Sequence, residues 1–323
     1  MIQKSKFKVF ITREIPNAAI KLLKDKGYNV RVYSKDSPIP VKELYKNIKD
    51  ADAVISLLNE KFDVAVLDKM EKCKIIANYA VGYNNIDIEY AKKKNIIITN
   101  TPDVLTDSTA DLAMALVLAC ARKIIEAEKY VHTGEFKGWK PKLFLGIEIK
   151  DKMFGILGGG RIGTAVAIRA KAFGAKIIYL SRRKNQYLED STGAKKVSLD
   201  TLLKTSDFIS IHLPLTYITY HLLNKEKLSL MKKTSVLINT ARGEIVDEKI
   251  LIRILKQKKI CCAGFDVFEN EPNINPELLE LGNVVALPHI GSATVEARTK
   301  MALLAAENII SVLSGKGAIT PVL

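Results

Sequence analysis

The stretch from Lys152 to Lys184 reads KMFGILGGGRIGTAVAIRAKAFGAKIIYLSRRK, and it decides the fold of this 323-residue chain. Apolar runs at residues 153–157 and 175–180 predict two buried strands, and the amphipathic pattern of residues 161–173 predicts a helix between them. The turn into this helix has the spacing G-x-G-x-x-G, which permits a tight turn, the approach of a pyrophosphate and close helix packing. We therefore predict a dinucleotide site rather than an ordinary glycine-rich turn, with contacts from Gly158, Gly160, Arg161, Ile162 and Gly163.

The end of the second predicted strand indicates which dinucleotide binds. An NAD site places an Asp or Glu about 20 residues beyond the glycines to bind the ribose 2′-hydroxyl. This chain has Ser181, Arg182 and Arg183 there instead. Because the planar guanidinium matches phosphate oxygens, we predict that NADP(H) is preferred and that NAD(H) is possible. The alternative is a solvated basic turn.

The composition is that of a globular protein, with 48% hydrophobic and 26% charged residues in a chain long enough for two domains. The net charge of +15 comes mostly from scattered lysines, which suits the attraction of small anions better than nucleic-acid binding. The longest uncharged apolar run, residues 112–121, is about half a membrane span. No signal peptide is apparent, and the four cysteines form no C-x-x-C pair. We expect a cytoplasmic protein with no metal site, no membrane partner and no nucleic-acid partner.

Ahead of the nucleotide unit, short apolar runs alternate with helical patterns over residues 9–99, which predicts a parallel, flavodoxin-like sheet. Thr101-Pro102-Asp103 breaks this pattern and marks a domain crossing. A final helix at residues 294–314 can pack back on the first domain. We therefore predict two doubly wound parallel-sheet α/β domains with a cleft between them. Residues 1–101 with 292–323 form the substrate domain, and residues 102–291 form the dinucleotide-binding Rossmann domain.

Residues 108–132 read as one long helix with apolar residues at core spacing, which predicts burial against the body of the protein or a second subunit. The following segment, residues 134–146, has neither helical nor strand periodicity and contains the only tryptophan, Trp139. An irregular arm with an aromatic side chain suits exchange between subunits. The alternative is that Trp139 packs on its own domain.

Polar residues follow several predicted strands, whose carboxyl ends line the ligand crevice in sheets of this kind. Gly82, beside Asn84-Asn85, forms either a plain turn or a cradle of N–H groups for a carboxylate. His212 either contacts the cofactor or is a structural histidine. Its neighbours Leu213 and Pro214, and the pair Thr240 and Ala241 on the next strand, reach the same edge.

Three successive predicted strands present Arg242, Glu271 and His289 at this edge, the first being the strand that ends in Thr240. Arginine can bind a carboxylate, histidine can exchange a proton near neutral pH, and a carboxylate can orient and charge the histidine. Together they form the set of groups that a ketoacid reductase needs. Glu269 competes with Glu271 on pattern alone, because both lie near the same strand end.

These residues lie in segments that resemble the D-isomer-specific 2-hydroxyacid dehydrogenase family, and most of all its glyoxylate/hydroxypyruvate reductases. The segments cover nearly the whole length in the family's order, and they read NYAVGYNNID, NTPDVLTDSTADLAMAL, GILGGGRIG, HLPLT, NTARGEIVDE, DVFENEP and LPHIGSAT. The resemblance implies hydride transfer from NADPH to a small anionic 2-oxoacid in a homodimer. Arg242 would bind the substrate, His289 would be the acid/base and Glu271 its partner.

The resemblance also implies the remaining ligand contacts. Asp266 would face the nicotinamide carboxamide, and the substrate would be contacted by Leu58, Val81, Gly82 and Trp139 of the partner subunit. Two alternatives stay open: a related enzyme acting on 2-ketogluconate, phosphoglycerate or phosphite, and a non-enzymatic nucleotide-sensing corepressor. The complete set of Arg242, Glu271 and His289 argues against the corepressor.

Overall fold

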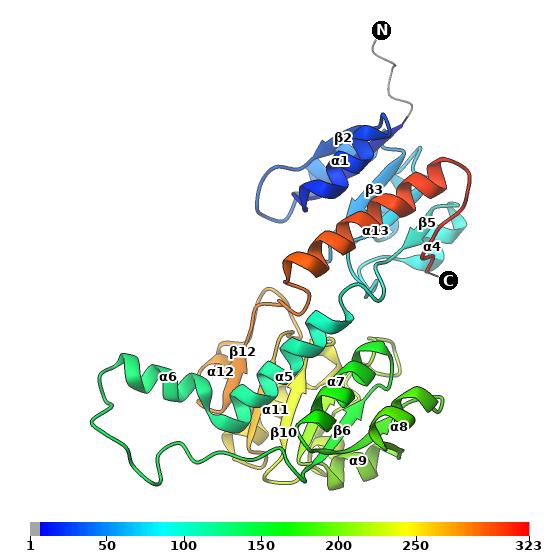
Figure 1. Cartoon of the computed structure of the whole chain (residues 1–323). Helices are drawn as coiled ribbons and strands as arrows, with labels where there is room; N and C mark the ends of the chain where they lie inside the picture. Colours follow the sequence, from blue (N-terminus) through cyan, green and yellow to red (C-terminus); the bar gives the residue numbers. More distant parts are fainter. Residues whose placement is uncertain (1–6, 323) are drawn as a thin grey trace. The chain divides into compact units, whose positions relative to one another are not determined.

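The computed structural model describes residues 7–322, which form two α/β units (Figure 1). One unit combines the chain up to Leu105 with the chain from Ser292 onward, and the other is Thr106–Gly291. The first crossing therefore follows Leu105, whereas the sequence pattern placed it after Thr101. The Thr101 N–H donates to the Ala80 carbonyl at 2.9 Å, which attaches the start of this connection to the first unit.

The first unit has a five-stranded parallel sheet in the order β2-β1-β3-β4-β5, which is the flavodoxin-like order that the sequence predicts. Alternate residues of the strands face opposite sides, and each side is covered by helices. Helices α1 and α13 lie side by side on one face (Figure 1), and the other three pack on the opposite face. The elements are β1 (Lys8–Ile11), α1 (Asn17–Asp25), β2 (Asn29–Val32), α2 (Val41–Ile48), β3 (Ala53–Ser56), α3 (Val64–Asp68), β4 (Ile75–Asn78), α4 (Ile88–Lys93), β5 (Ile97–Thr99) and α13 (Val295–Leu313).

The second unit has a seven-stranded parallel sheet in the order β12-β11-β10-β9-β6-β7-β8. Its strands are β6 (Met153–Leu157), β7 (Lys176–Leu180), β8 (Lys195–Lys196), β9 (Phe208–Ile211), β10 (Val236–Asn239), β11 (Cys262–Phe265) and β12 (Val284–Ala286). From β6 the chain adds strands toward one edge of the sheet, through β7 to β8, and then returns to add β9 to β12 on the other side of β6. The strand order therefore reverses between β6 and β9. Ligands of such sheets bind beside this switch point, at the carboxyl ends of the strands. The Rossmann prediction is confirmed, and the expected ligand edge is the one at which β6 and β9 end.

Two buried apolar clusters cover the two faces of this sheet. One is formed with α5 (Thr106–Arg122), α7 (Arg161–Ala172) and α8 (Gln186–Thr192). The other is formed with α9 (Leu199–Thr205), α10 (Lys225–Leu228), α11 (Glu248–Lys256) and α12 (Pro276–Leu279). The central strands between these clusters are therefore mostly apolar on both sides, and the candidate ligand groups lie near the carboxyl ends of the strands.

The single long helix predicted over residues 108–132 is wrong. Helix α5 ends at Arg122, and α6 (Ile124–His132) begins after Lys123, whose φ of 52° is left-handed and interrupts the helix. The predicted burial holds for α5, which buries eight residues, but no residue of α6 is buried. In Figure 1, α6 and the segment after it extend away from the sheet of their unit. Over residues 7–322, no helix combines the length and the apolar character that crossing a membrane requires.

Candidate active site

The glycine loop after β6 has the geometry that a pyrophosphate needs. Gly158 has a φ of 110°, and a Cβ there would meet the His212 carbonyl oxygen at 2.5 Å. A Cβ on Gly163 would collide with the Gly158 carbonyl, so the third glycine lets the helix approach the loop. A Cβ on Gly160 would meet no atom within 4 Å, and α7 begins at this point without a side-chain cap from residues 7–322. The open space before uncapped N–H groups fits a dinucleotide phosphate.

Asn185, which the sequence patterns did not bring out, connects this glycine loop to the loop after β7. Its Nδ2 donates to the Gly159 carbonyl at 2.8 Å and to Thr164 Oγ1 at 3.1 Å. Its Oδ1 accepts the Leu188 N–H at the start of α8. An Asn just before a helical pattern is an N-cap signal, which offered a way to find it in the sequence.

The predicted 2′-phosphate residues lie at the end of β7. Arg182 and Arg183 are exposed, and neither guanidinium forms an ion pair within residues 7–322. The Arg182 carbonyl accepts the Lys196 ammonium at 3.0 Å, which adds a third cation to this strand end. The group is therefore available to an anion from solution.

His212 follows β9 and is held by its own strand. Its Nε2 lies 2.8 Å from Ser210 Oγ. The residue is half-buried, and this burial lowers the pKa of His212 to about 3. The ring is thus neutral at ordinary pH, which favours the structural alternative, while its backbone lies against Gly158. Directly after the next strand, β10, Thr240 Oγ1 is buried without a hydrogen-bond partner in the described part of the chain.

His289 and Glu271 form a close pair at the same edge. His289 Nδ1 lies 2.8 Å from Glu271 Oε2, and both side chains are about one-third exposed, at 32% and 35%. Glu271 Oε1 accepts the Phe268 N–H at 3.0 Å. Because an ionised carboxylate only accepts hydrogen bonds, the His289 proton lies on Nδ1 and Nε2 is directed away from Glu271.

The charge state of Glu271 follows from its neighbours. Burial works to raise its pKa, but the hydrogen bond and charge of His289, the Phe268 N–H and the Arg242 charge together hold the pKa of Glu271 below its ordinary value. The side chain is therefore a carboxylate at neutral pH. A carboxylate in this position stabilises the imidazolium form of a histidine, which is the form that can donate a proton.

Asp266 fixes the turn that carries His289. Its Oδ1 accepts the Ile290 N–H and its Oδ2 accepts the Gly291 N–H, both at 2.7 Å. Burial raises the pKa of Asp266, and the two backbone N–H groups oppose that rise. His289 itself has a left-handed φ of 56°, and the two bonds to Asp266 stabilise the turn that carries its ring. The contact of Asp266 with a nicotinamide stays a prediction.

Arg242 lies next to the segment that carries Glu271. Burial lowers the pKa of Arg242, while the charges of Glu271 and Glu244 oppose that effect. Its Nη1 donates to the Ala241 carbonyl at 2.6 Å. The neighbouring Gly243 lies directly against the backbone of Phe268, so closely that a Cβ there would collide with it. Backbone packing thus connects the arginine turn to the glutamate turn.

Their histidine partners distinguish the two candidate glutamates. Glu271 contacts His289, whereas Glu269 contacts His221, with Nε2 of His221 at 2.9 Å from Glu269 Oε1. His221 was missed in the sequence because it lies outside the strand ends, in the segment before α10. The backbone of His221 is held by another segment, because its N–H donates to the Glu244 carbonyl at 2.8 Å.

In the first unit, Val81 and Gly82 follow β4 with their carbonyls turned inward. The Val81 carbonyl accepts Asn100 Nδ2 and the Gly82 carbonyl accepts Asn78 Nδ2, each at 2.8 Å. Neither amide N–H donates to any atom of residues 7–322. The turn therefore offers two free donors, as a carboxylate cradle requires. Leu58, half-buried after β3, belongs to the same unit.

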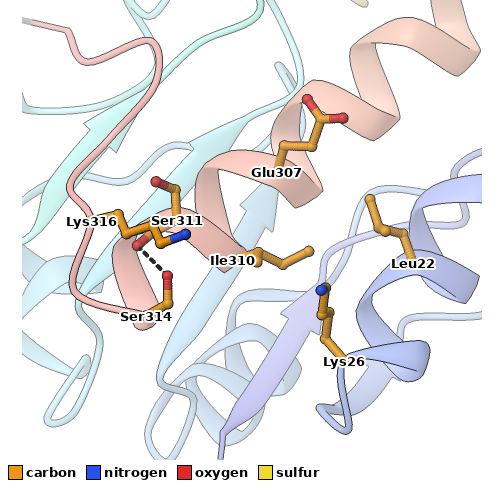
Figure 2. Close-up of a pocket in the computed structure, with 7 residues that line it drawn as sticks. All are labelled: Leu22, Lys26, Glu307, Ile310, Ser311, Ser314 and Lys316. Atoms are coloured by element: carbon orange, nitrogen blue, oxygen red, sulfur yellow. Dashed lines mark hydrogen bonds between the residues drawn. The ribbon is translucent and has the colours of Figure 1, made fainter.

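The first unit also contains a cavity away from these residues. It has a volume of about 310 Å³ and opens between α1 and α13 (Figure 2). Its lining residues are Leu22, Lys26, Glu307, Ile310, Ser311, Ser314 and Lys316. None of the candidate site residues is among them, so this cavity is separate from the candidate active site.

Trp139 is exposed to 83%, and it packs on no core of its own unit. Other large apolar side chains of α6 and the segment after it are also exposed, namely Ile124, Ile125, Val131, Phe136 and Leu145. An apolar group of this size on a surface is typical of a protein interface.

The chain is similar to known proteins over nearly its whole length. The chain is 52% identical over 313 residues to the glyoxylate reductase of Thermococcus litoralis, covering 96% of this chain and 94% of that relative. The crystal structure of a glyoxylate reductase from Paecilomyes thermophila matches with a TM-score of 0.88 and 33% identity over 98% of each chain. An NADPH-dependent glyoxylate/hydroxypyruvate reductase from Sinorhizobium meliloti, in complex with NADP and malonate, matches with a TM-score of 0.86 and 31% identity over 98% of this chain and 97% of that one.

A family model, the NAD-binding domain of D-isomer-specific 2-hydroxyacid dehydrogenases, matches residues 114–291. This range contains the glycine loop, Arg242, Glu271 and His289. The extent of this match and the identity to curated relatives lead to one conclusion. The chain belongs to the D-isomer-specific 2-hydroxyacid dehydrogenase family.

Proposed function

We propose that this protein is an NADPH-dependent reductase of small 2-oxoacids, with glyoxylate or hydroxypyruvate as the substrate. The observation that carries the proposal is the His289–Glu271 pair at 2.8 Å, beside Arg242, on the edge of a sheet whose glycine loop fits a dinucleotide. The names of the relatives support the choice of substrate.

The roles of the residues follow from their chemistry. Arg242 binds the substrate carboxylate and keto oxygen, because a guanidinium forms paired hydrogen bonds to such oxygens. His289 donates the proton that the developing alkoxide takes up, and Glu271 stabilises the charged imidazole until then. The bound reduced nicotinamide supplies the hydride. The free amides of Val81 and Gly82 are the further donors that we propose for the substrate carboxylate.

The preference for NADPH over NADH rests on Arg182 and Arg183. Each charge-assisted hydrogen bond contributes roughly 1.5–3 kcal/mol, so replacing both arginines with alanine should lower kcat/KM for NADPH about 100-fold or more. The value for NADH should stay nearly unchanged, because that cofactor has no 2′-phosphate. Equal losses with both cofactors would contradict the assignment of Arg182 and Arg183 to the 2′-phosphate. The control for a general loss of positive charge is Lys195→Ala on the neighbouring strand β8.

The homodimer rests on the exposed apolar side chains of α6 and the arm that contains Trp139. We propose that this surface is covered by a second copy and that the arm reaches the partner's active site. Trp139→Ala should therefore change the ratio of kcat/KM between glyoxylate and hydroxypyruvate while the protein stays dimeric by sedimentation. An unchanged ratio would show that Trp139 contacts no substrate.

The function is tested with purified protein and a panel of 2-oxoacids, following NADPH oxidation by absorbance. The panel holds glyoxylate, hydroxypyruvate, 2-ketogluconate and pyruvate, and phosphite is assayed with NADP⁺ in the oxidising direction. We expect the highest kcat/KM for glyoxylate or hydroxypyruvate. Binding of NADPH without turnover of any of these compounds would favour the nucleotide-sensing alternative.

A further inference from the structure

Glu269 lies two residues before Glu271, and its pair with His221 takes no direct part in the proposed chemistry. It joins segments 48 residues apart in the chain, and its side chains are 28% and 19% exposed. His132 and Glu128 on α6 form a contact of similar length, but within one helical turn and with both side chains exposed. The enclosure and long range of the first pair indicate that it holds two segments together.

His221 is itself held firmly. Its ring stacks on Tyr220 with centroids 4.1 Å apart, and its φ of 47° is left-handed. Two residues on, the Leu223 N–H donates to the Ile245 carbonyl at 3.0 Å. This segment therefore runs along the turn that follows Arg242, and His221 is a fixed donor for the Glu269 carboxylate.

Glu269 is also connected to α11 by two reciprocal hydrogen bonds. Its Oε2 accepts the Glu248 N–H at 3.4 Å, and its own N–H donates to Glu248 Oε2 at 3.3 Å. Burial raises the pKa of Glu248, and the nearby Glu269 charge adds to that rise. The carboxyl groups of Glu248 and Glu269 repel each other when both are charged. The hydrogen bond from His221 on the other side of Glu269 offsets this repulsion and stabilises the Glu269 carboxylate.

The segment Phe268 to Glu271 is thus fixed at both ends. Glu269 fixes one end through His221 and Glu248, and the Phe268 N–H bonds directly to Glu271 Oε1 at 3.0 Å. The other oxygen of Glu271 contacts His289. A shift of Glu269 would move the neighbouring Phe268. Because the Phe268 N–H donates to Glu271 Oε1, the Glu271 carboxylate would then change its orientation.

We propose that His221 is a positioning residue that acts through Glu269 to hold the Glu271 carboxylate against His289. The proposal rests on the proposed function, because Glu271 and His289 are its acid/base pair. It predicts that the loss of the His221 donor affects the chemical step and leaves cofactor binding unchanged. A residue that only supports the fold would show no energetic coupling to Glu271.

The first test compares His221→Leu, which removes the donor, with His221→Gln, which keeps one. A misplacement of about 1 Å in an active site costs up to ~100-fold, and we expect His221→Leu to lower kcat on the order of tenfold with an unchanged KM for NADPH. His221→Gln should restore most of the loss. The control is Glu277→Gln, which breaks the exposed Lys256–Glu277 pair of 2.6 Å in the same unit and should leave kcat unchanged.

The second test is a double-mutant cycle with Glu271→Gln. Residues that act as one unit show strongly non-additive losses, so His221→Leu should lower kcat no further once Glu271 is glutamine. Independent, multiplying losses would overturn the proposal, and so would an unchanged kcat in His221→Leu alone. If His221→Leu does not fold, Glu269→Gln replaces it in the same cycle.

A spectroscopic measurement separates this proposal from the proposed function. The chain has four histidines, so the Nδ1 proton of His289 can be assigned by its loss in Glu271→Gln, using imidazole proton and nitrogen NMR. In His221→Leu this hydrogen-bonded signal should broaden or move toward the position of a solvent-exposed proton, and in His221→Gln it should return. An unchanged signal overturns the proposal whether or not the wild type turns over, whereas absence of turnover in the wild type overturns the proposed function alone.

Discussion

His212 and His289 both follow strands of the same parallel sheet, yet their surroundings give them opposite chemistry. His212 is half-buried beside a serine hydroxyl, and burial lowers its pKa to about 3. His289 is one-third exposed and contacts a carboxylate whose pKa is held below its ordinary value. Position at a strand end therefore brings a histidine to the ligand edge, while its partner and its solvation decide whether it can exchange a proton.

The largest effect should come from replacing each histidine in turn. His289→Asn removes the proton donor and should lower kcat on the order of 10²–10⁴-fold at every pH. His212→Gln keeps a hydrogen bond to Ser210 and should leave kcat nearly unchanged, since only the His212 backbone borders the glycine loop. Steady-state kinetics of both variants decide this. Comparable losses in kcat would mean that the two histidines do not differ in role.

A smaller effect should come from the partner of His289. Glu271→Gln removes the negative charge that favours imidazolium and keeps most of the shape. Reduction needs the charged ring, so the falling limb of its kcat/KM profile should move to lower pH, because the charges of Glu271 and His289 stabilise each other. Oxidation of the hydroxyacid needs the neutral ring, so its rising limb should move in the same direction. The measurement is the pH profile in both directions, and two unmoved limbs would exclude Glu271 as the electrostatic partner.

The smallest effect should appear in stability and concerns His212. Its folded pKa of about 3 lies below the unfolded value of about 6.5. Between these values the unfolded chain binds a proton that the folded chain does not. The contribution of the neutral His212 ring to the free energy of unfolding is therefore complete above pH 6.5 and is lost as pH falls toward 3. At pH 5 the free energy of unfolding should be lower by about 1–2 kcal/mol than at pH 7 because of this histidine.

His212→Gln has no titrating ring and should lack this part of the pH dependence. Urea midpoints of the wild type and His212→Gln at pH 7 and pH 5 provide the measurement. Equal changes in both proteins would show that the ring is hydrated in the folded state. The difference between His212 and His289 would then depend on their partners alone.

The order of the elements was readable in the sequence. Short apolar runs that alternate with helical spacing predicted both parallel sheets, and the Gly158, Gly160 and Gly163 spacing predicted the loop that the structure shows. These features depend on residues close together in the chain, where periodicity and backbone freedom act directly. The helix break at Lys123 was not readable, because a lysine with positive φ has no local signal of its own.

Side-chain pairing was decided only by the tertiary structure. Glu269 and Glu271 are indistinguishable by pattern, and the choice between them depends on His221 and His289, which reach them from 48 and 18 residues away. In the same way, only the structure shows that Asn100 and Asn78 bind the carbonyls of Val81 and Gly82, and that the two amide N–H groups donate to no atom of residues 7–322. The sequence by itself determined which groups reach the ligand edge, since strand order is set by local hydrophobic pattern and chain connectivity. Which of those groups contact one another depends on hydrogen bonds that span distant segments, and only the folded chain brings these within about 3 Å.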